Sequence, residues 1–263
     1  MKTIYFQIII PNYNSEKWIK TCIDSVLNQT YPCFNLVIVD DMSTDNSVNI
    51  IKEYAMKDIR ITLIENKEKR WNGGSRNVGI NQKILTDYTL FLDSDDWFYD
   101  NKCLENLKNA IIDNNYPDCI RLPYVFLQGN YQKKVMLNED NPKDLVNSLY
   151  VAPWTKCIKS KLAVKFPENT LIEDVVQHIA QCDVIETVAV CDTPMVVWNR
   201  NNVNATSLKE NQHFYNSKRI SSIYRNIADL MDLECEHDYC EEHRKWRIEC
   251  YKNIVREGKE ETF

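Results

Sequence analysis

Short apolar runs alternate with segments of helical periodicity through the first half of this chain. The runs are rich in Ile, Val, Leu, Phe and Tyr and are nearly continuous, as expected of strands covered on both faces. Alternation of strand and helix favours a parallel or mostly parallel sheet with right-handed crossovers. The predicted strands are 4–10, 34–39, 60–64 and 87–92, and the predicted helices are 15–29, 45–57, 74–84 and 101–114.

The alternation weakens in the second half of the chain. Two strand-like stretches within 118–137 flank a Gln-Gly-Asn turn and predict a strand pair, and Pro123 at the start of the first stretch indicates a sheet edge. The other elements expected before residue 200 are a helix from about 171 and strands at 184–190 and 194–198.

The last fifty residues predict helices alone. One helix has an apolar face, and a second helix is expected over 239–257. We therefore expect an α/β domain over 1–208 and a helical C-terminal extension over 209–263. The apolar face would suit packing on the domain, homo-oligomerisation or peripheral contact with the cytoplasmic face of a membrane. Its residues are Ile220, Ile223, Tyr224, Ile227, Leu230 and Met231.

Composition narrows the class of protein. Acidic residues outnumber basic residues by 38 to 32 over the 263 residues, which argues against a nucleic-acid-binding surface. No apolar run reaches the roughly 18 residues of a membrane span. The N-terminal run resembles a weak signal peptide but lacks a small-residue cleavage site, so a buried first strand is the preferred interpretation. We therefore expect a cytoplasmic protein whose ten cysteines, scattered from Cys22 to Cys250, are reduced thiols.

Acidic residues gather at the ends of the predicted strands. In an open α/β sheet, ligands bind at the carboxyl ends of the strands. Asp40 and Asp41 follow the second strand, and Asp93, Asp95 and Asp96 follow the fourth. Five carboxylates at one sheet edge cost folding free energy unless a cation or hydrogen-bond donors offset their repulsion. The sequence therefore predicts such a partner at this edge.

A glycine-rich stretch precedes the predicted helix 74–84. Three of the five glycines, Gly73, Gly74 and Gly79, stand within seven residues. A Gly-Gly pair before a helix lets backbone amides approach an anion, which the helix N-terminus also favours. Arg76 in the first turn would then face a diphosphate or pair with nearby aspartates. A tight turn with a surface arginine explains the same residues, so both interpretations stay open.

Asp93 and Asp95 form an Asp-x-Asp sequence with hard oxygen ligands, which suit Mg²⁺ or Mn²⁺ better than zinc. Alone, such a sequence is common in solvated loops. Here it follows a strand and faces a second Asp pair and a Gly-Gly-Ser-Arg turn. This combination favours a site for a metal ion and a diphosphate.

Four blocks together resemble family 2 glycosyltransferases. They are Ile-Ile-Ile-Pro-Asn-Tyr-Asn at 8–14, Val-Asp-Asp-Met-Ser-Thr-Asp at 39–45, Gly-Ser-Arg-Asn-Val-Gly at 74–79 and Leu-Asp-Ser-Asp-Asp-Trp at 92–97. The resemblance covers about residues 4–200 with all blocks in order. It implies a GT-A fold, which is Rossmann-like with a mostly parallel sheet flanked by helices. It also implies a nucleotide-sugar half over about 1–100 and an acceptor half over about 101–208.

The resemblance carries residue roles as well. It implies that Pro11 and Tyr13 line a nucleoside pocket and that Asp41, with or without Asp40, binds the base. Arg76 would brace the pyrophosphate, Asp93 would hold the ribose, and Asp93 and Asp95 would hold the metal ion. One departure is visible, because family members usually carry glycine where this chain has Met42. Both neighbouring aspartates are still in place.

An inverting transfer also needs a carboxylate that takes the proton of the acceptor hydroxyl. Thr170 and Glu173 have the spacing of a capping box, which indicates a structural role for Glu173; the alternative is a contact with the acceptor. Asp174 matches the base of the family's Glu-Asp motif, and the helix start stabilises its anion. His178, one turn on, would contact the acceptor or metal, or lie on the helix surface. Trp154 resembles the acceptor-side tryptophan of the family, although core packing explains it equally well.

Four residues near the C-terminus resemble a zinc-binding set: Cys235, His237, Cys240 and His243. Their spacing is compressed, and on one continuous helix the four side chains would spread over roughly 200° of the circumference. Free thiols and surface histidines are therefore the preferred interpretation.

These observations predict an inverting glycosyltransferase with Mn²⁺ or Mg²⁺. It would move a sugar from a nucleotide-diphosphate sugar, such as a UDP-sugar, to a hydroxyl of a glycan or lipid-linked acceptor. A sugar-nucleotide pyrophosphorylase would need a glycine-rich loop after the first strand, where this chain has Pro-Asn-Tyr-Asn. A catalytically inactive nucleotide-sugar-binding or scaffold module would predict loss of Asp93, Asp95 or Asp174, and all three are present.

Overall fold

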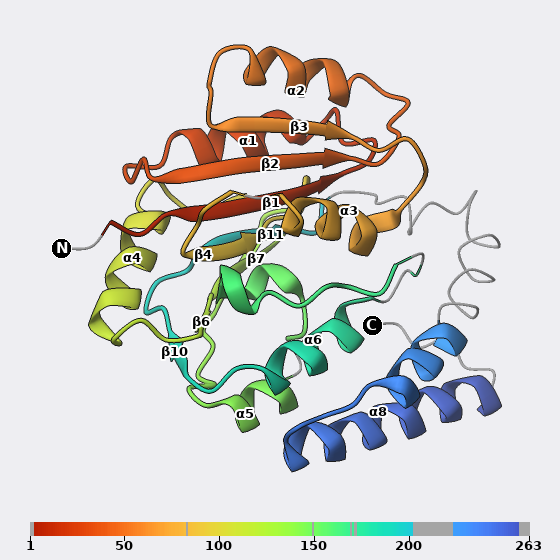
Figure 1. Cartoon of the computed structure of the whole chain (residues 1–263). Helices are drawn as coiled ribbons and strands as arrows, with labels where there is room; N and C mark the ends of the chain where they lie inside the picture. Colours follow the sequence, from red (N-terminus) through yellow and green to blue (C-terminus); the bar gives the residue numbers. More distant parts are fainter. Residues whose placement is uncertain are drawn as a thin grey trace.

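In the part of the chain that this computed structural model describes, a seven-stranded sheet and a four-stranded sheet carry the fold (Figure 1). After β4 the chain passes between the two sheets several times, so the sheets are interleaved along the sequence. The described residues are 3–82, 84–148, 150–168, 170, 173–201 and 223–257.

Parallel strands form the first half of the large sheet. The order β4-β1-β2-β3 places β1 between two parallel neighbours. All residues of β1 are buried; Ile8 and Ile10 pack in one hydrophobic cluster and Ile9 in another. A strand covered on both faces needs consecutive apolar side chains, which explains the continuous apolar run. The bounds are β1 Phe6–Asn12, β2 Phe34–Asp40, β3 Ile61–Glu65 and β4 Tyr88–Phe91.

The second half of the large sheet includes an antiparallel strand. β9 (Lys156–Lys159) runs antiparallel to both β4 and β6 (Cys119–Arg121), and β10 (Val188–Val190) runs parallel to β6. Because β9 lies between β4 and β6, it joins the two halves of the sheet. The sheet is mostly parallel, as predicted.

Helices cover both faces of the large sheet (Figure 1). α1 (Ile19–Leu27) and α2 (Ser47–Ala55) lie on one face, whereas α3 (Trp71–Ile80) lies on the other face beside α6 (Glu173–Asp183). The α1 side chains that enter the core are spaced three and four residues apart, as in other amphipathic helices. The remaining helices before residue 200 are α4 Cys103–Asp113, α5 Pro142–Asn147 and two 3₁₀ turns, Pro153–Thr155 and Ser160–Leu162.

The four-stranded sheet has the order β5-β11-β7-β8. β7 (Tyr124–Gln128) and β8 (Tyr131–Val135) form the strand pair that the sequence predicts, and β5 (Trp97–Phe98) and β11 (Val196–Asn199) complete the sheet. The expected edge position is wrong, because β7 has partners on both sides. Pro123 precedes β7, so its missing N–H removes no hydrogen bond from that strand.

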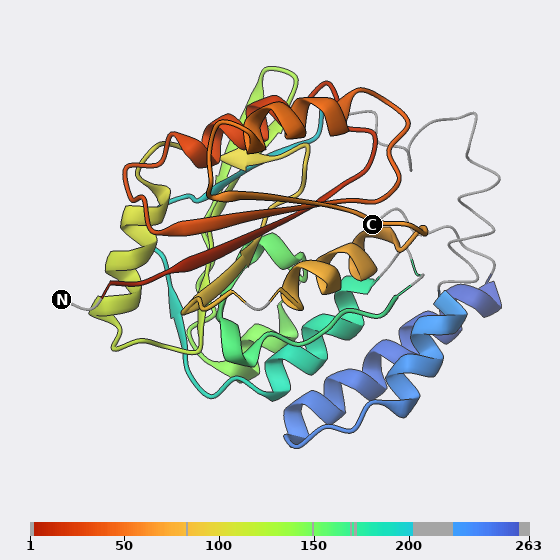
Figure 2. The ribbon, with the colours of Figure 1, turned by 45° about the horizontal axis from the view of Figure 1, so that its top comes forward.

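The C-terminal helices pack on α5 and α6 (Figure 2). Residues 223–232 and α8 (Asp238–Glu257) are helical. Of the three alternatives for these helices, the structure shows packing on the domain. Their buried residues join Ile179 and Cys182 of α6 in one cluster; they are Ile223, Leu230, Cys240, Ile248 and Tyr251.

The predicted apolar face of the extension is only partly buried. Tyr224 and Met231 are exposed, and Ile220 lies outside the described residues. Among the helices that the structure describes, none is long and apolar enough to cross a membrane.

A buried histidine links α8 to α5. His243 Nδ1 lies 3.1 Å from Asn147 Oδ1, and its Nε2 accepts a hydrogen bond of 3.3 Å from Arg247 Nε. Both contacts fit a neutral imidazole that carries its proton on Nδ1. Burial and the neighbouring charge of Arg247 lower the pKa of His243 to about 4.

Mild acid should therefore destabilise the protein. An unfolded histidine titrates near pH 6.5, so between about pH 6.5 and 4 the unfolded chain binds a proton that folded His243 does not. Because of this difference in proton binding at His243, the free energy of unfolding should be about 2 kcal/mol lower at pH 5 than at pH 7. Urea denaturation at both pH values measures the effect, and His243→Gln should show a smaller loss.

His237→Gln is the control for this prediction, because the His237 side chain is 38% exposed. It should not reduce the pH dependence. An equal loss of stability in wild type and His243→Gln would contradict the prediction.

Candidate functional site

Two groups of aspartates lie at the carboxyl edge of the large sheet, as the sequence predicts. Asp40 ends β2 and Asp41 follows it, whereas Asp93, Asp95 and Asp96 follow β4. The strand order β4-β1-β2 places β1 between the two groups. Each group has its own hydrogen-bond donors, so the repulsion between carboxylates is offset locally.

Asp40 is buried and holds the turn after β2. Its carboxylate accepts hydrogen bonds from Asn12 Nδ2 at 2.6 Å and from the hydroxyl and amide of Ser43 at 2.5 and 3.0 Å. Because Asn12 ends β1, these bonds tie together the ends of two central strands. This geometry gives Asp40 a structural role at the ends of β1 and β2.

Asp41 is bound to the loop between β3 and α3. Its Oδ1 accepts hydrogen bonds from Asn66 Nδ2 at 3.0 Å and from the Arg70 amide at 2.7 Å. Its Oδ2 accepts the Trp71 amide at 2.8 Å and lies 3.2 Å from Lys69 Nζ. The two backbone amides at the start of α3 are thereby satisfied, so Asp41 helps to begin that helix.

Lys69 connects Asp41 with Tyr13. Its Nζ lies 2.9 Å from the centroid of the Tyr13 ring, which is a cation–π contact, and burial lowers the pKa of Lys69. Tyr13 is 40% exposed, whereas Pro11 is buried within β1. The sequence analysis missed Lys69, because its position depends on how the loop folds over the end of β2.

Met42 adopts a backbone conformation that favours glycine. Its φ is 65°, in the left-handed region, and its side chain is half exposed. The residue begins the turn whose amide and hydroxyl at Ser43 bind Asp40. This conformation gives a physical reason for the glycine that is usual at this position in the family that the sequence resembles.

Gly73 and Gly74 lie inside α3, so the prediction of a Gly-Gly loop ahead of a helix is wrong. A Cβ atom at Gly73 would collide with the carbonyl oxygen of Pro167, and a Cβ atom at Gly74 would stand 2.7 Å from Arg70 Cβ. Gly73 therefore allows close packing of α3 against the segment before α6, whereas Gly74 leaves room for the Arg70 side chain at the start of the helix.

Arg76 connects two parts of the candidate site. Its guanidinium is almost completely buried and donates to Asp93 Oδ1 at 2.8 Å and to Glu173 Oε1 at 2.7 Å. Of the alternatives left open for Arg76, the structure favours pairing with an aspartate over a contact with a diphosphate. Despite burial, the two carboxylates raise the pKa of Arg76. Among the described residues, its Nε has no hydrogen-bond partner.

Glu173 and Asp174 begin α6. The predicted capping box is wrong, because Glu173 pairs with Arg76 and the Thr170 hydroxyl is hydrogen bonded to Asn226 at 3.2 Å. Burial and the charge of Asp174 raise the pKa of Glu173 to about 7, although Arg76 opposes the shift. Burial also raises the pKa of Asp174, with Arg76 again acting against it.

Asp96 is a buried carboxylate that anchors the Asp-x-Asp turn. It accepts the Asn199 amide at 2.8 Å, and Asn199 Nδ2 donates to the Asp95 carbonyl at 3.1 Å. Burial and the charges of Asp95 and Asp93 raise the pKa of Asp96 well above its ordinary value. Asn199 was not predicted, because it is 104 residues from Asp95 and only the pairing of β11 brings it there.

His178 is fully buried, so the expectation that it contacts the acceptor or lies on the helix surface is wrong. Its Nε2 lies 3.0 Å from the Leu145 carbonyl oxygen, which joins α6 to α5. Burial and nearby cations lower its pKa well below the ordinary value. Trp154 is also buried and meets Tyr124 edge-on at 5.0 Å between ring centroids, as its core-packing interpretation requires.

The four cysteine and histidine residues near the C-terminus contact different partners. His237 Nδ1 lies 3.3 Å from Asp183 Oδ1, whereas His243 contacts Asn147. His243 is buried, so the expectation of a surface histidine is wrong there. Over the described part of the chain, no group of three or more His, Cys, Asp or Glu residues could hold a metal ion.

A family model matches most of the chain. The model of Glycosyl transferase family 2 matches residues 7–189, a range that contains every predicted site residue from Pro11 to His178.

Curated relatives are longer than this chain. The glycosyltransferase GlyA of Streptococcus pneumoniae is 30% identical over 186 residues, which cover 64% of this chain and 26% of that protein. The poly(ribitol-phosphate) beta-N-acetylglucosaminyltransferase TarS of Staphylococcus aureus is 34% identical over 176 residues, which cover 62% of this chain and 30% of that protein. The match thus spans less than a third of each relative.

Solved structures share the fold. Residues 1–349 of S. aureus TarS in complex with UDP-GlcNAc give a TM-score of 0.73 at 21% identity, over 95% of this chain and 72% of that chain. The mannosyltransferase PcManGT from Pyrobaculum calidifontis, in complex with GDP-Man and Mn²⁺, gives 0.59 at 16% identity, over 98% of this chain and 76% of that chain. These likenesses confirm the predicted GT-A fold.

Replacing Met42 by glycine should stabilise the protein. Left-handed backbone costs a residue with a side chain about 1 kcal/mol, and Met42 buries little surface that the change would expose. Met42→Gly should therefore raise the free energy of unfolding by about 1 kcal/mol, measured by chemical denaturation. Met56→Gly is the control, because Met56 is exposed with helical φ. A higher free energy of unfolding in Met56→Gly, or an unchanged one in Met42→Gly, would count against this explanation.

Removing the Arg76 guanidinium should strongly lower the free energy of unfolding. Arg76→Met leaves Asp93 and Glu173 without their shared cation, and breaking a buried pair costs about 3–5 kcal/mol. Thermal or urea unfolding measures the loss. Arg70→Met is the matched control, because Arg70 pairs with Glu68 at 2.6 Å near the surface and should lose less than about 1 kcal/mol. Similar losses in both variants would contradict the prediction.

Proposed function

The chain belongs to glycosyl transferase family 2, and on this premise we propose that it transfers a sugar from a nucleotide-diphosphate sugar to a hydroxyl of a glycan. The observation that carries the proposal is the Arg76 bridge. One buried cation holds Asp93 of the Asp-x-Asp turn and Glu173, whose neighbour is Asp174. A donor-side carboxylate and a candidate base are thereby kept in one cluster.

The nucleoside would bind at the carboxyl ends of β1 and β2. Tyr13 offers an exposed ring. The family resemblance implies that Asp41 binds the base, and in this structure the buried Asp41 carboxylate is hydrogen bonded to Asn66 and to the amides of Arg70 and Trp71. Lys69 lies on the Tyr13 ring and contacts Asp41, so it would shift when a base stacks there. UDP is the first nucleotide to test, because the solved TarS complex contains UDP-GlcNAc.

Asp93 and Asp95 would hold Mn²⁺ or Mg²⁺. Two carboxylates with diphosphate oxygens and water are a usual ligand set for such ions. A cation there would also offset the repulsion among Asp93, Asp95 and Asp96, which stand within one short turn. Bound there, the ion would stabilise the charge of the departing diphosphate. Arg76 would act indirectly, by holding Asp93 in place.

Asp174 would be the general base. The acceptor oxygen attacks the anomeric carbon as its bond to the diphosphate oxygen breaks, and the hydroxyl proton passes to the Asp174 carboxylate. The configuration at that carbon is thereby inverted. Arg76 lowers the pKa of Asp174 against the effect of burial, which keeps the carboxylate available to accept a proton.

The acceptor would be a cell-envelope glycan or a lipid-linked glycan. TarS is named as an enzyme that acts on poly(ribitol-phosphate), a polymer. The match spans 30% of that relative, so its name supports a glycan or polymer acceptor for this chain and no particular polymer.

The experiment separates donor binding from transfer. Calorimetric titration of UDP with Mn²⁺ should show binding that EDTA or Asp95→Asn weakens at least about tenfold. Asp174→Asn should retain this binding but lower the rate of UDP release from UDP-GlcNAc and acceptor by about 10²–10⁴-fold. Because burial raises the pKa of Asp174, the wild-type rate should decline in acid at a higher pH than an ordinary aspartate would give.

Asp113→Asn, a change at the exposed end of α4, is the matched control and should affect neither measurement. A protein that binds no UDP, GDP or dTDP with either metal would refute the proposal and favour a scaffold role.

A further inference from the structure

Aromatic side chains form a row that crosses the four-stranded sheet from the core to the surface. Neighbouring rings lie 5.0–6.2 Å apart between centroids. Trp154 and Tyr124 are buried, Trp198 and Phe126 are partly buried, and Tyr131 is 59% exposed. We call these five side chains the aromatic row. Its outer members are accessible to a ligand on the surface of the sheet.

The strand register puts the outer rings on one face of the sheet. Trp198 of β11 is opposite Phe126 of β7, which is opposite Lys133 of β8. Directly paired residues point to the same face, so these side chains share a face with Tyr131, two residues before Lys133. Lys134 points to the other face, where its Nζ lies 5.3 Å from the centroid of the Tyr99 ring.

The strand that carries Trp198 contacts the Asp-x-Asp turn. Asn199, directly after Trp198, donates its amide to Asp96 and its side-chain N–H to the Asp95 carbonyl. The strand that carries Trp198 is therefore attached to the turn of the candidate donor site.

Two cations flank the outer rings. Lys133 is exposed on the same face, and the Arg200 guanidinium lies 5.1 Å from the centroid of the Trp198 ring. Within the described part of the chain, neither forms a salt bridge with a carboxylate. This face therefore combines aromatic surface with positive charge, although the whole chain has a net charge of −6.

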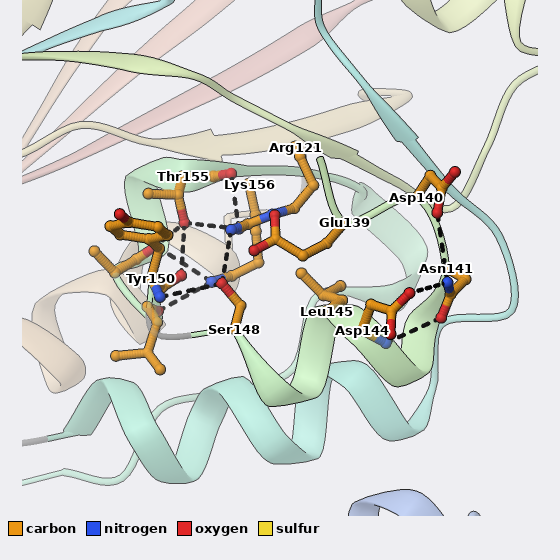
Figure 3. Close-up of polar contacts among 12 residues, drawn as sticks. Arg121, Glu139, Asp140, Asn141, Asp144, Leu145, Ser148, Tyr150, Thr155 and Lys156 are labelled. Carbon is orange, nitrogen blue, oxygen red and sulfur yellow. Dashed lines mark hydrogen bonds and ion pairs between the residues drawn. The ribbon is translucent and has the colours of Figure 1, made fainter. Parts of the chain in front are cut away.

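A buried polar network holds the segment that carries the inner end of the row (Figure 3). Arg121 is fully buried and donates to the carbonyl and hydroxyl of Thr155 at 3.2 and 3.0 Å and to Ser148 Oγ at 3.2 Å. Movement of this segment would leave buried donors unsatisfied, which is costly. Trp154, next to Thr155, is therefore held in place before any ligand binds, which reduces the entropy cost of binding.

We propose that this face binds the acceptor and that the acceptor is an anionic glycan chain. The inference rests on the proposed function, because it names the acceptor class of that transfer. The C–H groups of sugar rings pack on aromatic faces, whose centres carry negative charge. Lys133 and Arg200 would pair with phosphate or carboxylate groups along the chain. A surface that presents several rings suits a chain better than a single sugar.

Affinity electrophoresis tests binding without requiring transfer. Native gels would contain poly(ribitol phosphate), hyaluronan or neutral dextran, so that the phosphate and carboxylate arms identify the anionic group. The wild-type protein should be retarded by at least one anionic polymer, less so at higher salt. Retardation by dextran to the same extent, or by no polymer, would overturn the inference.

Variants on one strand locate the binding face. Tyr131→Ala and Lys133→Ala remove exposed side chains and should each weaken retardation about three- to tenfold. Lys134→Ala is the matched control, because it removes the same charge from the opposite face and should have no effect. Equal losses in the two lysine variants would overturn the assignment to this face.

UDP titration of the same proteins separates this inference from the proposed function. Variants that lose retardation and keep the wild-type affinity for UDP support both. UDP binding without retardation by any glycan overturns only this inference. Retardation that depends on Lys133 in a protein that binds no nucleotide would support this face and refute the proposed function.

Discussion

The geometry of the candidate site depends on the two ion pairs of Arg76. Burying the charged groups of Arg76 and Glu173 is costly, and attraction between opposite charges offsets that cost only when the contacts are close. Arg76 meets this condition, at 2.8 Å from Asp93 and 2.7 Å from Glu173. Because Asp93 follows β4 and Glu173 begins α6, the same contacts set the position of α6 relative to the sheet edge. The neighbouring Asp174 is positioned as a consequence.

The aspartates after β2 serve a different purpose. Asp40 and Asp41 accept hydrogen bonds from turns and loops at the carboxyl ends of β1, β2 and β3, and thus satisfy backbone amides that no strand or helix pairs. Lys69 contacts both the Asp41 carboxylate and the exposed ring of Tyr13, so it links these two residues. These carboxylates therefore shape the surface on which a nucleoside would bind.

Contacts between distant segments hold the small sheet and the segment before β9 in place. Asn199 of β11 holds the turn at Asp95 and Asp96, while Arg121 of β6 holds Thr155 and Ser148. The donors in both sets are buried, and leaving them without acceptors would cost free energy. Other arrangements of these segments are therefore disfavoured. The small sheet is thereby attached to the carboxyl edge of the large sheet.

The sequence by itself determined the first four strands, the three helices between them and the meeting of the aspartates at one edge. Buried parallel strands need consecutive apolar residues, and their carboxyl ends must lie together. Only the tertiary structure decided that Glu173 pairs with Arg76, 97 residues away, that Gly73 serves helix packing, and that His178 is buried. Burial and charge pairing depend on segments far apart in the chain, and local patterns carry no information about which of them meet.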